Sequence, residues 1–523
     1  MAKKSLFKST STVGGMTLLS RILGFVRDMV IAQNFGASAG ADAFFVAFKI
    51  PNFLRRLFAE GAFAQAFVPV LAEYKTQRSE GEIKAFVGAI SGTLGGVLVL
   101  VTLLGVLGAG GLIAIFAPGF YDEPEKYALA TDMLRFTFPY LLFISLTAFA
   151  GAVLNTYDRF AVPAFTPVLL NLSLIGMALG IAPLLDVPIM ALAWGVLLAG
   201  IVQLLFQIPY LYALGLLTWP TWGWRDSGVR RVMKLMIPAI FGSSVAQINL
   251  LLDTVIASFL VTGSVSWLYY SDRLVEFPLG VLGIALATVI LPSLSKKHAA
   301  ESTQAFSDTI DWALRWVVII ATPAALGLFM LSGPMLTTLF QYGEFSTHDV
   351  RMAGYSLMAY SLGLLGFIFV KVLVPGFYAR QDVMTPVRIG IVAMVANMVL
   401  NLLFVVPMVM TDFVAPHMGL ALATAASAFL NAGLLYYLLR KRSVYMPKQG
   451  WGRLVAQVVF AGALMVVVLW WGASDMNQWF AWSAWERIMK LFLWIGVGAV
   501  SYFSALYLVG LRVNQLKALM KQH

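Results

Sequence analysis

Long apolar stretches separated by short polar connections dominate the chain. Most of them reach or exceed the roughly 20 residues that an α-helix needs to cross a bilayer. The short alternating segments typical of a transmembrane β-barrel are absent from the sequence. The pattern predicts an all-α polytopic membrane protein with fourteen transmembrane helices, near residues 12–33, 42–72, 86–117, 128–152, 160–183, 188–213, 232–260, 266–293, 307–332, 350–376, 386–409, 417–440, 452–473 and 488–510.

Composition supports the same class. Of 523 residues, 60% are hydrophobic and 12% are charged, whereas soluble domains carry about 25% charged residues. This excludes soluble enzymes and disordered regulators. The chain has no cysteine, which excludes disulfides and thiolate chemistry.

The net charge of +11 reflects membrane topology rather than nucleic-acid binding. Basic residues gather at both termini and in every second connection, for example at 75–84, 225–234 and 440–453. The positive-inside rule then places the N- and C-termini in the cytoplasm. The cytoplasmic excess can also contact anionic membrane lipids, and we expect no nucleic-acid partner.

Three local matches indicate an internal duplication. Residues 28–32 (DMVIA) recur as 253–257 (DTVIA), 68–71 (VPVL) resemble 291–294 (LPSL), and 166–168 (TPV) recur as 385–387. The matches keep chain order at a slowly changing offset, which predicts two homologous six-helix lobes in parallel orientation. We therefore expect an N-terminal lobe over 1–220, a C-terminal lobe over 221–445, and two further helices with a tail over 446–523.

Motifs for enzymatic chemistry are missing from the sequence. No G-x-x-x-x-G-K-[ST] occurs, and the four histidines have no metal-ligand spacing. The sequence predicts neither an enzyme nor a bound cofactor.

Charged residues inside the spans are the informative feature, because each costs about 2.5–3.5 kcal/mol on insertion and by default marks a polar cavity. Arg273 and Glu276 stand at i,i+3 and Arg56 and Glu60 at i,i+4, so both pairs can form on one helix face. Three arginines lack an acid at i±3 or i±4. They are Arg21, Arg27 and Arg55. Either they bind an anion such as phosphate, which suits the guanidinium fork, or they join an interhelical salt-bridge lattice that includes Asp42.

The stretch 42–72 would form a helix of about 45 Å, longer than the ~30 Å hydrocarbon core. It contains Pro51 and Gly61, so we expect a bend or break in it.

A second polar group is predicted in the C-terminal lobe. Asp253 is mid-span, Asn397 and Asn401 share a helix face, and Thr424 lies mid-span in the next helix. These oxygens could bind Na⁺, or Asp253 could exchange a proton. The alternatives are a hydrogen-bonded polar cluster between helices and an ion pair of Asp253 with Lys371.

Several motifs resemble the MurJ/MviN lipid II flippase family of the multidrug/oligosaccharidyl-lipid/polysaccharide exporter superfamily. The resemblance covers residues 10 to about 450, and its motifs are 20–28 (SRILGFVRD), 42–62 (DAFFVAFKIPNFLRRLFAEGA), 263–278 (GSVSWLYYSDRLVEFP), 341–343 (QYG) and 375–378 (PGFY).

The resemblance implies a transporter of the bacterial inner membrane that moves lipid II between leaflets by alternating access. It implies that five charged residues line the cavity and bind the pyrophosphate: Arg21, Arg27, Asp42, Arg55 and Arg273. Asn52, Arg56, Glu60 and Glu276 belong to the same motifs as second-rank positions. It further implies a lipid-tail groove at the last two helices and, as energy source, Na⁺, H⁺ or the membrane potential. Other cell-wall synthesis proteins are possible partners.

Two other transporters and one non-transporter remain open as alternatives. An exporter of another lipid-linked oligosaccharide would show the same arginines. A cation-coupled drug exporter should carry surplus acids in its cavity, whereas the spans near residues 12–72 and 266–293 are rich in arginine. A scaffold for cell-wall enzymes would tolerate neutral residues at these positions.

Overall fold

The structure is a computed structural model that describes residues 2–57, 63–299 and 302–511. In these ranges the chain is helical, with no β-strand. It divides into two compact units, Met1–Ser266 and Trp267–His523. The domain boundaries expected from the duplication, after residues 220 and 445, stay a prediction.

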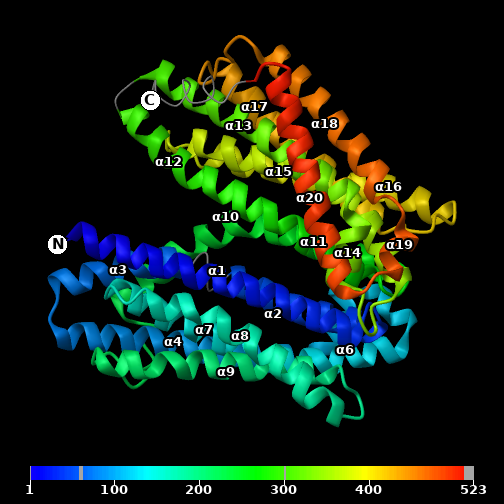
Figure 1. The fold of residues 1–523 in the computed structure, drawn as a ribbon. Coiled ribbons are helices and arrows are strands. Elements are labelled where there is room, and N and C mark those ends of the chain that lie inside the picture. Colours follow the sequence, from blue (N-terminus) through cyan, green and yellow to red (C-terminus); the bar gives the residue numbers. More distant parts are fainter. Residues whose placement is uncertain (1, 58–62, 300–301, 512–523) are drawn as a thin grey trace. The chain divides into compact units, whose positions relative to one another are not determined.

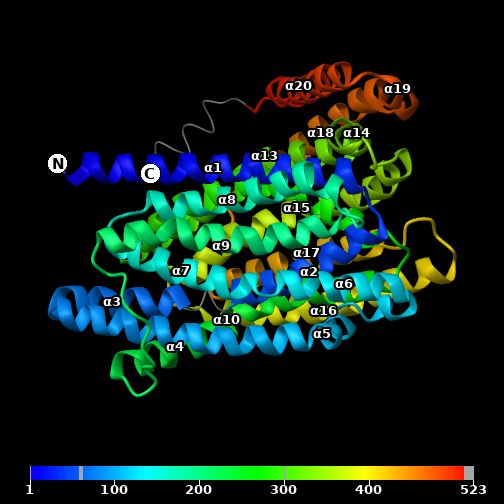
Figure 2. The same cartoon turned by 90° about the horizontal axis from the view of Figure 1, so that it is seen from below.

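The first unit is a bundle in which sequence-distant helices lie side by side. Within it α1 packs against α8, α7 against α9, α2 against α6, and α3 against α10; Figures 1 and 2 show α7, α8 and α9 next to one another. Its helices are α1 (Ala2–Phe35), α2 (Ala39–Arg55), α3 (Ala64–Gln77), α4 (Glu80–Leu107), α5 (Ala109–Phe116), α6 (Pro124–Thr137), α7 (Tyr140–Thr156), α8 (Ala161–Gly176), α9 (Met190–Ala213) and α10 (Ser227–Ser258).

The second unit begins within α11 (Ser264–Pro278). Helix α15 packs against α13 and α17, α17 against α16, and α18 against both α13 and α20. Its remaining helices are α12 (Ile284–Ala299), α13 (Thr303–Met330), α14 (Ser332–Phe340), α15 (Thr347–Tyr378), α16 (Met384–Met410), α17 (Met418–Lys441), α18 (Trp451–Ala473), α19 (Met476–Ala481) and α20 (Ala484–Leu508).

Ten helices in the described residues are long and apolar enough to cross a membrane. The stretches 12–33, 42–72, 232–260 and 266–293 are also helical in their described parts but fall outside those ten. In 42–72 and 266–293 the chain forms shorter regular helices, of 17 and 14 residues (α2, α3) and of 15 and 16 residues (α11, α12). The all-helical membrane class is confirmed, and the total of fourteen spans stays a prediction.

The stretch 42–72 is not one regular α-helix, and the bend or break expected in it stays a prediction. Pro51 lies inside α2, which ends at Arg55, and the next regular helix begins at Ala64. The backbone widens to a π-helical turn at residues 56 and 57. Residues 58–62, which include Glu60 and Gly61, lie outside the described residues.

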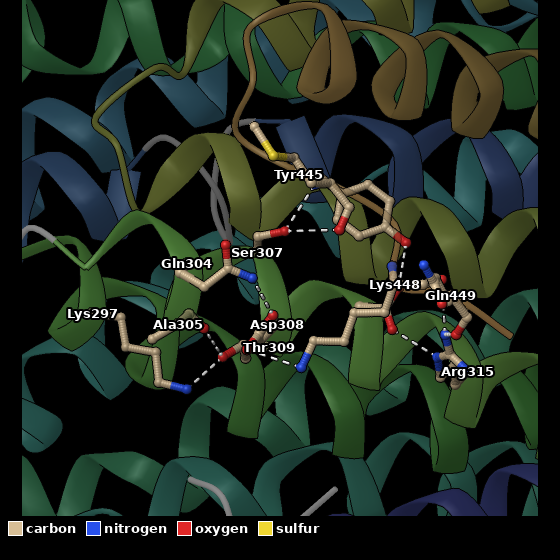
Figure 3. A network of polar contacts seen from close by, with 12 residues as sticks. Lys297, Gln304, Ala305, Ser307, Asp308, Thr309, Arg315, Tyr445, Lys448 and Gln449 are labelled. Atoms are coloured by element: carbon tan, nitrogen blue, oxygen red, sulfur yellow. Dashed lines mark hydrogen bonds and ion pairs between the residues drawn. The ribbon is translucent and has the colours of Figure 1, made fainter. Parts of the chain in front are cut away.

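A polar hub fastens the α17–α18 connection to α13 in the second unit. Asp311 is 1% exposed and accepts hydrogen bonds from Tyr445 Oη at 2.8 Å and Trp451 Nε1 at 2.8 Å, while Arg315 Nε lies 2.7 Å from its other oxygen. Arg315 also donates to the carbonyls of residues 448 and 449. Figure 3 shows Tyr445 and residues 448–449 next to Arg315 on α13. The hub aligns the start of α18 with α13.

Candidate functional site

Arg27 and Asp28 form a buried ion pair on α1. Arg27 Nη2 and Nε lie 2.7 and 2.9 Å from one oxygen of Asp28, and the two residues are 6% and 1% exposed. Arg27 Nη1 donates to Asn171 Oδ1 on α8 at 3.1 Å, and Asn171 Nδ2 donates to the carbonyl of Ser20. At Gly24 α1 lies close to Asn171, since a Cβ there would meet this side chain at 3.6 Å, an ordinary van der Waals distance. The sequence rule for helix faces overlooked the adjacent acid.

Arg21 differs from Arg27 although both stand on α1. Its side chain is exposed and forms no hydrogen bond or ion pair with any residue that the structure describes. No intramolecular charge partner therefore competes with an anionic ligand for this guanidinium in the described part of the chain.

Asp42, in the first turn of α2, is the most highly coordinated carboxylate of the first unit. It is 1% exposed and accepts from Gly263 N at 2.7 Å, Ser266 N at 2.9 Å and Ser266 Oγ at 2.6 Å. Lys126 Nζ lies 3.3 Å from its second oxygen. The predicted lattice of Asp42 with Arg21 or Arg55 is not what these distances show, because amides and a lysine occupy its oxygens.

Lys126 on α6 links Asp42 to a wider polar group, the Asp42 cluster, which we define as Asp42, Glu123, Lys126, Gly263 and Ser266. The ammonium is 4% exposed and also contacts Glu123 Oε1 at 3.4 Å and Thr262 Oγ1 at 3.1 Å. Burying a lysine costs free energy unless the ammonium is paired. The ion pairs of Lys126 with Asp42 and Glu123 offset this cost at the start of α2.

The other α2 positions lie one to four turns further along. Arg55 donates through Nε and Nη2 to Asn52 Oδ1 at 2.9 and 2.7 Å, so Asn52 holds the guanidinium plane. Lys49 donates to Thr254 Oγ1 on α10 at 2.6 Å. Arg55 and Arg56 are half-buried.

In the second unit the predicted pair of Arg273 and Glu276 is confirmed. Arg273 Nη1 lies 2.7 Å from Glu276 Oε2, and its Nη2 donates to Tyr269 Oη at 3.2 Å. The guanidinium also lies 5.0 Å from the centre of the Tyr269 ring. The side chain is 31% exposed, which leaves part of the guanidinium accessible.

Three of the four residues of the candidate cation site meet in the second unit. Asn397 Nδ2 lies 3.3 Å from both Thr424 Oγ1 and Ser427 Oγ, and Asn401 Nδ2 donates to Asn397 Oδ1 at 3.0 Å. Asn397 and Asn401 are fully buried. Asp253 is half-buried on α10, in the first unit.

Sequence reasoning missed Lys126 and Asn171. Lys126 stands among acids in a connection that the charge pattern places outside the membrane, and its rarity there was the available signal. Asn171 is a single amide in an apolar span. Each gained its role from a partner more than 80 residues away, which periodicity cannot reveal.

The arrangement suits anion capture without covalent chemistry. Within each unit, basic side chains contact carboxylates and amides that fix their direction, and guanidinium groups bind phosphate in bidentate fashion. No group of three or more metal-ligating side chains occurs among the residues that the structure describes. The apolar helices and these buried charges define a polytopic membrane protein.

Comparisons identify the family. Residues 31–490 match the family model described as lipid II flippase MurJ. The chain is 50% identical over 522 residues to the probable lipid II flippase MurJ of Vibrio cholerae, covering 98% of each chain, and 50% identical over 514 residues to that of Haemophilus influenzae, covering 96% and 99%. The chain belongs to the MurJ family.

Solved structures show the same fold. A structure of lipid II flippase MurJ in an inward closed conformation matches with a TM-score of 0.76 at 23% identity, covering 95% of this chain and 99% of that one. An inward-facing multidrug resistance MATE family transporter of the MOP superfamily matches with a TM-score of 0.62 at 14% identity, covering 83% and 97%. These identities establish the fold alone.

Proposed function

We propose that this protein is a lipid II flippase, which moves the undecaprenyl-pyrophosphate-linked peptidoglycan precursor from the cytoplasmic to the periplasmic leaflet of the bacterial inner membrane. The observation that carries the proposal is 50% identity over 98% of both chains to a relative described as a probable lipid II flippase. Transport of this kind requires no covalent step, so the protein acts as a transporter rather than an enzyme.

The substrate site in this proposal consists of Arg21, Arg27, Arg55 and Arg273, which hold the pyrophosphate. Asp42 orients the site. Arg21 supports the proposal most directly, because its exposed guanidinium has no ion pair with the described residues. Arg55 and Arg273 contribute partly accessible guanidinium groups whose planes are held by Asn52 and Tyr269. Arg27 is already paired with Asp28, so its contribution depends on exchange of that partner.

The cycle in this proposal is alternating access by two six-helix lobes, with fourteen spans in total, both termini in the cytoplasm and a lipid-tail groove at α18 and α20. The repeated motifs support the two lobes, and the distribution of basic residues supports the orientation. Similarity to inward closed and inward-facing transporter structures supports a fold that can alternate.

The decisive experiment measures lipid II translocation by purified protein in liposomes, with Arg21→Ala as the test and Arg135→Ala as the control. Arg135 is an exposed arginine paired with Asp132 on α6, outside the proposed site. We expect Arg21→Ala to reduce translocation at least tenfold at unchanged protein level and melting temperature. Full activity of Arg21→Ala would contradict the site, and translocation of other undecaprenyl-linked glycans at equal rates would contradict lipid II as the specific substrate.

Coupling to Na⁺, H⁺ or the membrane potential completes the proposal. Asp253 and the amide and hydroxyl group at Asn397, Asn401 and Thr424 are the candidate cation ligands, and close packing of the last three supports a shared role. The alternative is a purely structural cluster. Asp253→Asn should abolish any dependence of translocation on Na⁺ or pH. If that variant keeps the wild-type rate across both series, the carboxylate has no obligatory role in coupling.

A further inference from the structure

The second unit contains an open pocket whose lining includes none of the proposed substrate residues. It has a volume of about 370 Å³ and is lined by residues from three different connections. They are Lys297 at the end of α12, Ser302, Thr303 and Phe306 at the start of α13, Arg380 after α15, and Arg442, Ser443 and Val444 after α17. Basic residues in cytoplasmic loops are expected from topology alone. Topology does not explain why basic side chains from three separate loops line the same pocket.

The charge of this pocket is strongly positive. Its described lining carries three cations, Lys297, Arg380 and Arg442, and no acid. Of the nearby carboxylates, Asp382 lies 2.6 Å from Nη1 of the lining residue Arg442 and balances one of the three charges, whereas Asp308 lies 2.9 Å from Lys448 Nζ. Glu301 precedes Ser302 in the sequence and lies outside the described residues.

Two of the three cations, Lys297 and Arg442, are held in place by hydrogen bonds. Lys297 Nζ donates to Thr309 Oγ1 at 2.6 Å, which Figure 3 shows on the neighbouring turn of α13. Arg442 Nη2 donates to Thr385 Oγ1 at 3.2 Å while Nη1 binds Asp382. Burial would raise the pKa of Asp382, but the hydrogen bonds from Thr385 and Arg442 outweigh burial and keep the pKa low. Asp382 therefore remains a fixed anchor for Arg442.

The start of α13 adds donors to the same pocket. Ser302 does not cap the helix with its side chain, and no acid stands in the first turn. A helix N-terminus carries about half a positive charge and favours anions. The hydroxyls of Ser302, Thr303 and Ser443 border the same space. This helix end strengthens a field that the three cations already create.

We propose that this pocket binds a phosphoryl anion. Two guanidinium groups, one ammonium and three hydroxyls match the oxygens of a phosphate in number and kind. The pocket lies where α13, α16 and α17 begin or end, which is the depth of lipid headgroups for helices that cross the membrane. The phosphate can therefore come from an anionic phospholipid or from free phosphate in solution. This site goes beyond the proposed function and does not depend on it.

The test compares pocket variants with charge-matched controls on the full chain. Lys297→Gln and Arg380→Gln each remove one lining cation, and the double variant removes two. Arg388→Gln and Lys441→Gln remove one neighbouring basic charge outside the lining. Native mass spectrometry measures binding of phosphatidylglycerol, with diacylglycerol as the ligand that lacks phosphate. Equilibrium dialysis of delipidated protein measures binding of inorganic phosphate.

We expect the double variant to bind phosphatidylglycerol, inorganic phosphate or both at least tenfold more weakly than the wild type, while the controls change less than twofold. An effect confined to phosphatidylglycerol assigns a lipid source, and an effect confined to inorganic phosphate assigns a soluble one. Equal binding by pocket variants and controls at unchanged melting temperature overturns the proposal, as does equal binding of diacylglycerol. A variant with a lowered melting temperature is replaced by its lysine-to-arginine or arginine-to-lysine counterpart, which should retain binding.

Discussion

Two buried carboxylates, one in each unit, show how the same chemical group can be stabilised in different ways. Asp42 receives the backbone amides of Gly263, just before α11, and of Ser266, in its first turn, together with the ammonium of Lys126. Asp311 receives Arg315 from its own helix together with Tyr445 and Trp451. Both are 1% exposed. The two sites differ in how the cation that neutralises each carboxylate, Lys126 or Arg315, is itself held in position.

The difference lies in sequence distance and in the second partner of each cation. Arg315 is four residues from Asp311 and is anchored by two further carbonyls, so the Asp311 hub is a rigid joint within one unit. Lys126 is shared between Asp42 and Glu123, and the amides come from the residue before α11 and from the first turn of α11. The Asp42 cluster thus contains an ion pair that can exchange partners, which suits an element that moves in a transport cycle.

Asp42→Asn should produce the largest loss of stability. It leaves the buried ammonium of Lys126 without its closest carboxylate, and breaking a buried pair costs about 3–5 kcal/mol. We expect a lower midpoint of denaturant unfolding in detergent and loss of translocation. Adding Lys126→Met should recover part of the stability, because no charge is then buried alone. The control is Asp132→Asn, which breaks an exposed ion pair with Arg135 on α6, the helix that carries Lys126. A double variant no more stable than Asp42→Asn would show that the ion pair contributes little.

Asp311→Asn should cost about 2–3 kcal/mol, because Arg315 and the two aromatic donors lose a charged acceptor. Tyr445→Phe removes one of those hydrogen bonds and should cost about 1 kcal/mol. Translocation per folded molecule should stay at the wild-type rate in both variants. Reduced translocation at normal stability would end the distinction between a rigid joint and a moving cluster.

His417, in the turn before α17, is a buried residue that becomes a cation when it is protonated. Its ring is fully buried with Nε2 2.9 Å from the carbonyl of Met352, and burial lowers its pKa from 6.5 to about 4. The folded state therefore resists protonation of His417. Its contribution to the free energy of unfolding is fully present above pH 6.5 and is lost as the pH falls toward 4. Between pH 7 and pH 5 we expect the wild type to lose about 2 kcal/mol relative to His417→Gln. Parallel pH profiles would contradict this role.

Arg21→Lys should have the smallest effect on folding, about 0.5 kcal/mol or less, since exposed residues without fixed contacts contribute little. Arg27→Lys should cost more, because a single ammonium cannot replace the contacts to Asp28 and Asn171. Thermal unfolding of the two variants side by side measures the difference. Equal losses would mean that the contacts of Arg27 do not stabilise α1 against α8.

Much of the fold was predictable because membrane burial writes a strong pattern into the sequence. The all-helical class followed from apolar length, and the bend or break expected in 42–72, a stretch too long for the bilayer, stays a prediction. Arg273 and Glu276 were predictable as a pair, since i,i+3 spacing places two side chains on one face regardless of tertiary context. The pair of Arg27 with Asp28 was not predictable from helix faces, because neighbouring residues point to different faces, yet a long arginine side chain can reach the residue next to it.

The sequence by itself determined which segments are helical, which are apolar, and which charged residues must find partners. Only the tertiary structure decided which residues are those partners. Asp42 meets Lys126 and Ser266, Arg27 meets Asn171, and three separate loops place Lys297, Arg380 and Arg442 around one pocket. The physical reason is that local propensity and hydrophobic periodicity act within a few turns of chain. The cost of burying a charge is instead met by whichever distant segment packing brings within hydrogen-bond distance.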